Sequence, residues 1–293
     1  MLIEPTSIAE KIIYSTVRIT AETSAGTSRG TGFFFNFPIK GISDQIVPVI
    51  ITNKHVVGDS KKQSFFLNLH NPNKDEKTPT SRLSIDLTES ELGKTWFAHP
   101  NADVDLCCLP IAKIQAVVPS PLEPYYVALT DEVTDDDLKA LDAIQDVIMV
   151  GYPNGLWDHV NNLPLVRKGT TASHPGIDYM VEGQPGPGVT VVDMACFPGS
   201  SGSPVFVYNS GVIPDKNGGA QIGTRAIFLG VLFSGPTRRE SGEIVVKTIP
   251  TKTVPVAELE LMINLGYVIK PREVTVLGKA LFKNKGIEFG GKG

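Results

Sequence analysis

The sequence contains few cysteines, no long apolar run and no excess of positive charge. Its three cysteines are Cys107, Cys108 and Cys196. Because neighbouring cysteines rarely bridge each other and the count is odd, no disulfide framework is expected. No apolar run approaches the ~20 residues that cross a bilayer, and the opening MLIEP lacks the basic segment of a secretory signal. The formal net charge is −4 over 293 residues, which gives no attraction for nucleic acid or an anionic membrane. We therefore expect a soluble, cytoplasmic protein without a nucleic-acid or membrane partner.

Histidine is absent after residue 174, and the five histidines are His55, His70, His99, His159 and His174. This absence matters because residues 197–205 (FPGSSGSPV) form a glycine-rich turn with Ser201 at its centre. An α/β-hydrolase triad runs serine, acid, histidine along the chain, so that order is excluded for Ser201. The G-x-S-x-G pattern also fails, because Ser203 stands where glycine is needed. Two orders remain: His–Asp–Ser, as in chymotrypsin-like barrels, and Asp–His–Ser, as in subtilisin-like α/β folds.

Glycine and proline, by contrast, are plentiful, with 28 and 22 residues spread along the chain. They favour many turns and short strands over long helices. Short runs rich in β-branched residues predict strands at 15–20, 30–35, 45–52, 64–69, 82–87, 106–111, 146–150, 165–173, 189–194, 204–208, 226–233 and 243–249. This pattern indicates an antiparallel barrel or sandwich, and so favours the His–Asp–Ser order.

Helices are expected in two places. Thr134 precedes three aspartates and then apolar residues at helical spacing, which predicts a capped linker helix. The spacing of residues 256–265 predicts a closing helix. Residues 209–223 are expected to form a mobile loop. The tail from Lys270 is expected to carry a β-like patch at 274–277 and to end in a flexible GGKG.

Three residues stand in contexts that suit nucleophilic catalysis. Ser201 lies in a turn that can expose its hydroxyl and aim backbone N–H groups at one point, as an attacking serine requires. His55 ends an apolar strand (IITNKHVV, residues 50–57), which suits a rigid general base. Asp105 opens the apolar run DLCCLP and needs a partner if it is buried. Asp103, two residues earlier, is an alternative to Asp105.

A metal site is not expected. His99, Asp103 and Asp105 are the conceivable ligands, but no thiolate or second histidine stands at ligand spacing. The sequence therefore predicts no metal and no cofactor.

Taken together, these residues resemble trypsin-like (chymotrypsin-fold) serine peptidases, and among them the bacterial HtrA-like and glutamyl-endopeptidase-like branch. The similarity runs in a consistent order over residues 12–266. It is carried by residues 30–33 (GTGF), 52–57 (TNKHVV), 105–109 (DLCCL), 150–155 (VGYPNG) and 193–204.

The resemblance implies an all-β fold of two six-stranded antiparallel barrels with a linker helix and a C-terminal helix. The corresponding parts are residues 1–118, a linker at 119–145, a second barrel with its closing helix at 146–268, and a tail at 269–293. The resemblance also implies a triad of His55, Asp105 and Ser201, in preference to Ser200 or Ser203. Peptide bonds would be cleaved through an acyl-enzyme. The N–H groups of Gly199 and Ser201 would form the oxyanion hole.

The sequence departs from the digestive members of the family at Ser200, where they carry an aspartate that pairs with a new N-terminus. We therefore expect no zymogen cleavage, and control by loop ordering, a regulatory protein partner or oligomerisation. The residues after 266 are too few for a PDZ domain. By family alignment, the pocket for the residue before the scissile bond (P1) is formed by Ala195, Leu232, Ser234 and Gly235, which predicts small or medium apolar P1 residues. Cys196 beside it is interpreted as a packing residue.

The predicted partner is a protein or peptide substrate. Two other interpretations of the sequence remain open. One is a chymotrypsin-fold interaction module whose site is latent or lost. The other is an esterase on the same scaffold.

Overall fold

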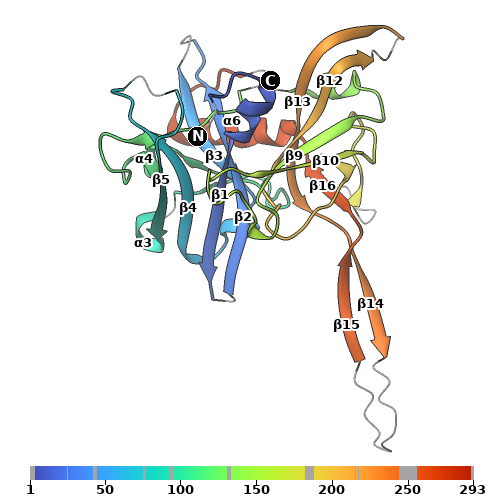
Figure 1. Ribbon diagram of the computed structural model, residues 1–293, viewed down its shortest axis with the longest axis horizontal. Coiled ribbons are helices and arrows are strands. Elements are labelled where there is room, and N and C mark those ends of the chain that lie inside the picture. Colours follow the sequence, from blue (N-terminus) through green and yellow to red (C-terminus); the bar gives the residue numbers. More distant parts are fainter. Residues whose placement is uncertain are drawn as a thin grey trace, which may run out of the picture.

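The computed structural model describes residues 4–24, 26–41, 45–74, 77–92, 95–130, 133–181, 188–214, 216, 218–243 and 256–291. Strands dominate these residues, and they form two large sheets (Figure 1). The fold is therefore mostly β, as predicted. None of the helices in the described ranges has the length and apolar character that spanning a membrane requires.

The first sheet is open rather than a closed six-stranded barrel, so that prediction is wrong. Its strands are paired in the order β5-β4-β1-β2-β3-β7-β6, with β8 beside β4. In the described residues the two end strands do not pair, because the chain leaves β5 through helix α3 (Glu89–Leu92) and β6 is only two residues long. The strands are β1 (Thr16–Thr23), β2 (Gly26–Pro38), β3 (Ile46–Thr52), β4 (Ser60–His70), β5 (Ser81–Thr88), β6 (Phe97–Ala98), β7 (Cys107–Pro110) and β8 (Glu123–Pro124).

The second sheet closes into a six-stranded barrel, as predicted, in the order β10-β11-β16-β13-β12-β9. Its strands are β9 (Asp146–Gly151), β10 (Leu165–Thr171), β11 (Val189–Asp193), β12 (Pro204–Pro214), β13 (Ala220–Ser234) and β16 (Leu265–Ile269). A separate two-stranded ribbon of β14 (Thr237–Glu243) and β15 (Val256–Met262) projects away from the body (Figure 1). Most of the strand predicted at 243–249 lies outside the described residues.

Short helices connect the strands. They are α1 (Ile8–Ile13), α2 (Lys54–Val57), α4 (Ala112–Gln115), α5 (Asp135–Lys139) and the 3-10 turn η1 (Pro153–Gly155). The linker helix α5 begins as predicted. The Thr134 hydroxyl accepts from the Asp137 N–H while the Asp137 carboxylate accepts from the Thr134 N–H, so the N-terminus of the helix is capped.

Residues 209–285 contain further differences from the sequence analysis. Residues 256–265 form β15 and the start of β16 instead of a closing helix. The tail instead contains the long helix α6 (Pro271–Lys285), with proline in its first turn and Gly286 at φ 67 as its C-cap. The predicted loop at 209–223 extends β12 and β13 into a paired hairpin.

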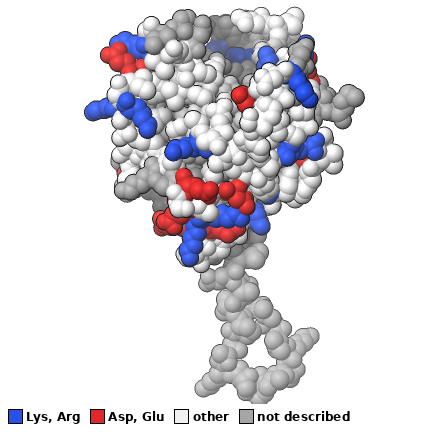
Figure 2. Space-filling model, turned by 90° about the vertical axis from the view of Figure 1, so that its left-hand side faces the viewer, with Lys and Arg blue, Asp and Glu red and all other residues white. Residues whose placement is uncertain are grey.

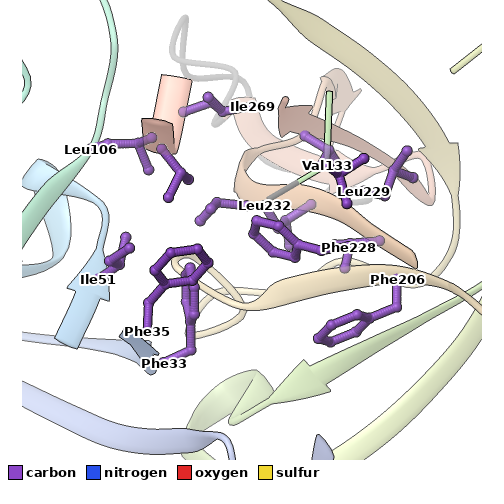
Figure 3. Packing of buried hydrophobic residues seen from close by; sticks show 14 of the residues in the cluster. Phe33, Phe35, Ile51, Leu106, Val133, Phe206, Phe228, Leu229, Leu232 and Ile269 are labelled. Carbon is purple, nitrogen blue, oxygen red and sulfur yellow. The ribbon is translucent and has the colours of Figure 1, made fainter. Parts of the chain in front are cut away.

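One apolar core joins the two halves (Figure 3). Phe33 and Phe35 of β2 point into it from the first sheet, and Phe206 and Phe228 enter from the barrel. The ring centroids of Phe33 and Phe228 are 5.6 Å apart. A shared core holds the edges of both sheets in fixed relation, so residues at those edges can form one site. On the surface, basic and acidic side chains lie interspersed (Figure 2).

Candidate active site

His55 is held by Asp105 at two points. The chain leaves β3 at Thr52 and turns into α2, which places His55 in the first turn of that helix. The backbone N–H of His55 donates to Asp105 Oδ1 at 3.1 Å, and His55 Nδ1 lies 2.5 Å from Asp105 Oδ2. A carboxylate at Nδ1 favours the tautomer with its proton there, which leaves Nε2 as an acceptor.

The loop before β7 fixes Asp105 itself. Asn53 Nδ2 donates to the backbone carbonyl of Asp105 at 2.7 Å. Lys54 Nζ donates to the carbonyl oxygens of Asn101 and Ala102 at 3.2 Å and 3.0 Å, which secures the same loop. The neighbouring carboxylate of Asp103 is exposed, and the structure places Asp105 against His55.

Ser201 lies in the turn between β11 and β12, and two glycines shape this turn. Gly199 and Gly202 have φ angles of 89° and 84°, a region that suits glycine because it lacks a Cβ. Ser200 and Ser203 are buried, whereas Ser201 is half-buried. The Ser201 hydroxyl donates to the carbonyl oxygen of Phe233 at 3.5 Å. Of the three serines, Ser201 is therefore the one with access to an incoming group.

Two N–H groups of the turn have no hydrogen-bond acceptor among the described residues. The N–H groups of Ser200 and Gly202 donate to the carbonyls of Phe197 and Leu232, at 2.9 Å and 2.8 Å. Those of Gly199 and Ser201 make no hydrogen bond to any described residue. Unpaired donors beside a hydroxyl can bind an anionic oxygen.

Ser201, His55 and Asp105 line one cleft of about 530 Å³, together with Cys196, Phe197, Pro198, Leu232, Phe233, Ser234 and Gly235. Leu232, Ser234 and Gly235 were predicted to form the P1 pocket. Ala195 was also predicted there, but it is half-buried and absent from the described lining of this cleft. Cys196 lines the cleft instead, and burial raises the pKa of its thiol to about 11.

The other histidines lie outside this cleft. His99 is buried, and its Nε2 lies 3.4 Å from Glu273 Oε2 of α6. Burial lowers its pKa below the usual value. Within the described ranges no group of His, Cys, Asp and Glu side chains has the arrangement of a metal site.

The sequence analysis missed one side chain that contacts the serine turn. Thr31 of β2 donates its hydroxyl to the carbonyl of Gly199 at 3.1 Å, and its N–H to the carbonyl of Ser201 at 2.9 Å. Thr31 lies in the GTGF segment, but a threonine between two glycines carries no signal of a contact 168 residues away.

Comparison with known proteins identifies the family of this chain. The family model described as "Trypsin-like peptidase domain" matches residues 30–213, more than half of the chain. The chain belongs to the trypsin-like peptidase family. This trypsin-like peptidase is thus a serine endopeptidase, a hydrolase of protein or peptide substrates. A search of curated proteins found no match.

Several solved structures are similar to this trypsin-like peptidase at low identity. An inactive form of Rv3671c from M. tuberculosis is 17% identical, with 94% of this chain and 90% of that chain covered and a TM-score of 0.45. The serine endoprotease from Yersinia pestis is 13% identical, with 96% and 68% covered and a TM-score of 0.48. A thermostable serine protease from an extremophilic microorganism is 12% identical, with 92% and 97% covered and a TM-score of 0.44.

Proposed function

We propose that this trypsin-like peptidase cleaves peptide bonds through a triad of His55, Asp105 and Ser201. The observation that carries the proposal is the position of Ser201. It lies in one cleft with the His55–Asp105 pair, in a turn where two N–H groups have no acceptor among the described residues. A nucleophile, an oriented base and oxyanion donors are the parts that acyl transfer requires.

The reaction follows from these positions. Ser201 Oγ bonds to the peptide carbonyl carbon as His55 Nε2 takes the hydroxyl proton. The carbonyl oxygen becomes an oxyanion that the N–H groups of Gly199 and Ser201 stabilise. The C–N bond then breaks as His55 returns the proton to the leaving amine. Water repeats the sequence on the acyl-enzyme, which releases the acid and restores Ser201. Asp105 stays ionised and stabilises the charged imidazole.

Ser201 Oγ makes no hydrogen bond to His55 among the described residues. Its contact is with the Phe233 carbonyl oxygen at 3.5 Å, at the long limit of such bonds, so it turns toward His55 before it attacks. A rotation about the Cα–Cβ bond redirects Oγ without moving the backbone. The same contact supports a second candidate function: a protease, or an interaction module with the same site, that stays latent until a partner redirects Ser201. Catalytic hydrogen bonds often tighten only when substrate is bound, so the active enzyme remains our main proposal.

The cleft also supports a preference for small or medium apolar P1 residues. Apart from the His55–Asp105 pair, no described residue in its lining carries a charged side chain. Leu232 and Phe233 supply apolar surface. The raised pKa of Cys196 keeps its thiol neutral near pH 7. Beyond that pair, the lining has no charged side chain to offset the desolvation of a charged P1 residue, and the Arg167 guanidinium lies outside the lining, 4.7 Å from the centroid of the Phe197 ring.

Labelling with a fluorophosphonate probe, followed by peptide mapping, tests the triad. We expect an adduct on Ser201 that disappears in Ser201→Ala and His55→Ala. Asp105→Asn should slow labelling by about 10⁴-fold if it acts as the triad aspartate does elsewhere. The matched control is Asp103→Asn, which alters an exposed carboxylate nearby and should leave the rate unchanged. Absence of any adduct would contradict the proposal, whereas labelling without turnover of any protein would favour latency.

A peptide library tests the P1 preference. We expect cleavage mainly after Ala, Val or Leu, because the cleft offers apolar contacts and no counter-charge. Cleavage mainly after Lys, Arg or Glu would contradict this part of the proposal and leave the triad intact.

A further inference from the structure

Thr31 contacts the serine turn from the opposite half of the molecule. Its side chain is fully buried on β2 of the first sheet. We infer that Thr31 is a positioning residue: its hydroxyl and N–H hold the turn in the conformation that aims the N–H groups of Gly199 and Ser201 at the substrate oxygen. This inference rests on the proposed function and names a residue that sets its efficiency.

The hydrogen bonds to the carbonyl groups of the turn explain the direction in which the N–H groups of Gly199 and Ser201 point. In a planar trans peptide the C=O and N–H point in opposite directions, so an anchored carbonyl aims the N–H of the same unit. The Pro198 carbonyl accepts from the Asn154 N–H at 2.6 Å, and the Ser200 carbonyl accepts from the Ser203 N–H at 3.0 Å. These two peptide units contain the N–H groups of Gly199 and Ser201, which therefore point the other way.

Thr31 anchors the two peptide units that alternate with these. Its hydroxyl binds the Gly199 carbonyl and its N–H binds the Ser201 carbonyl. Since each oxyanion donor lies between anchored units, the turn cannot rotate one peptide without breaking a bond to Thr31 or to its neighbours. Gly199 tolerates no added Cβ here, because one would lie 2.6 Å from the Tyr152 carbonyl oxygen.

The same hydroxyl also ties the turn to its supports. It accepts from the Tyr152 N–H at 3.1 Å, at the end of β9 and next to the Asn154 turn. The Thr31 carbonyl accepts from the Thr52 hydroxyl at 2.7 Å, two residues before α2 begins. Thr31 therefore connects the strand that leads to His55, the end of β9 and the serine turn. A buried hydroxyl with a fixed donor on one side has its own proton directed to the other, here to Gly199.

Neutral hydrogen bonds hold this turn, whereas the digestive members of the family use an ion pair between the aspartate before the nucleophile and a new N-terminus. Ser200 occupies the position before the nucleophile, and it is 1% exposed. The one hydrogen bond that its hydroxyl makes to the described residues is with the Phe197 N–H, at 3.4 Å, at the long limit of such bonds. The bonds from outside to the backbone groups of the turn come instead from Thr31, Asn154 and Leu232. The hydroxyl of Thr31 is the side-chain member of that set, so it can be removed by mutation.

The test compares Thr31→Val with Thr31→Ser in the full-length enzyme, using fluorophosphonate labelling of Ser201. Valine keeps the shape and removes the hydroxyl, whereas serine keeps the hydroxyl. We expect Thr31→Val to lower the maximal labelling rate by about 10- to 100-fold, with probe affinity unchanged, since full loss of an oxyanion donor costs about 10²–10³. Thr31→Ser should restore labelling to within about threefold of wild type, on the same reasoning.

Thr190→Val is the matched control for stability. Thr190 is also fully buried, and its hydroxyl bonds to Ser173 Oγ at 3.1 Å in the barrel, outside the serine turn. Both valine variants should lower the unfolding midpoint, but only Thr31→Val should slow labelling. If Thr31→Val does not fold, Thr31→Ala removes the same hydroxyl with less crowding. Equal rates in Thr31→Val and Thr190→Val, with wild type labelled, would overturn this inference alone. A wild-type enzyme that does not react would overturn the proposed function and this inference with it.

Discussion

The barrel closes through backbone pairing, whereas the first sheet leaves a gap between β5 and β6. In the barrel, β9 pairs with both β10 and β12. In the first sheet, side chains fill part of the gap. Trp96 stacks on Phe65 with ring centroids 6.5 Å apart and donates its indole N–H to Gln63 Oε1 at 2.8 Å. A cavity of about 410 Å³ remains beside them.

The candidate triad residues therefore have different surroundings in the two halves of the molecule. Ser201 lies between two strands of the closed barrel. Lys54, next to His55, and Cys107, close to Asp105, line the cavity at the gap. The His55–Asp105 pair therefore borders the gap, whereas Ser201 lies in a turn of the closed barrel. The contact between the halves at Thr31, Thr52 and Gly202 must keep the two in register.

Gly202→Ala should have the largest effect, because it acts at that contact. Gly202 has φ 84°, and an added Cβ would overlap the carbonyl oxygen of Thr31, a backbone atom that cannot move aside. We expect a loss of about 3 kcal/mol or more in the free energy of unfolding and loss of fluorophosphonate labelling. Chemical denaturation and labelling measure these effects.

Gly211→Ala separates strain from overlap. Gly211 has φ 97° in the extended part of β12, and an added Cβ there would meet nothing within 4 Å. We expect it to cost only about 1 kcal/mol from its φ alone and to leave labelling unchanged. Equal destabilisation by the two alanine variants would mean that the contact between the halves is not tightly packed.

Trp96→Ala should have an intermediate effect, confined at first to the gap. The side chain is half-buried, so we expect a loss of about 2 kcal/mol, below the cost of a fully buried tryptophan. Trp96→Phe keeps a ring against Phe65 but leaves Gln63 Oε1 unpaired, for about 1 kcal/mol. Hydrogen exchange should accelerate in β5 and β6 before it does in the barrel. Uniform acceleration over both sheets would contradict the comparison.

Much of the strand pattern could be predicted because each strand carries its own signal. The runs that predicted β1 to β5 and β9 to β13 alternate or are rich in β-branched residues. The open edge of the first sheet could not be predicted. Whether β5 and β6 meet depends on α3 and on Trp96, which lie between them in the chain, rather than on the strands themselves. The sequence pattern of a single strand does not indicate which edge strands of a sheet will pair.

The C-terminal errors had readable signals. Residues 257–261 (AELEL) alternate with period 2, which indicates a strand, although each is a good helix former. Val274, Leu277, Leu281 and Phe282 of α6 are buried at helical spacing, with proline at the start and glycine after the end, as helices favour. The β-branched residues in 274–277 hid that period.

The candidate site combines residues that the sequence indicated with residues that it could not indicate. A strand end and a glycine turn indicated His55 and Ser201, the family resemblance selected Asp105 over Asp103, and the structure brings these residues to one cleft. Thr31 and Asn53 could not be predicted, because their roles consist of contacts with distant backbone carbonyls. Such contacts depend on three-dimensional proximity, which neither residue type nor spacing encodes.

His99 should give the smallest effect, a pH dependence of stability on the His55–Asp105 side of the molecule. Its ring faces Glu273 of α6 and Lys54 of α2, and its Nδ1 accepts from the Asn101 N–H at 3.1 Å. Burial lowers the pKa of His99 in the folded protein, so the unfolded chain binds the proton more readily below its ordinary pKa of about 6.5. The midpoint of thermal unfolding should therefore decrease as the pH is lowered from 7.5 to 5.5. The decrease should be smaller in His99→Asn, whose amide oxygen can still accept from the Asn101 N–H. If the midpoint changes equally with pH in both proteins, another titrating group causes the change. The contact of His99 with α6 would then not make the stability of the loop before Asp105 depend on pH.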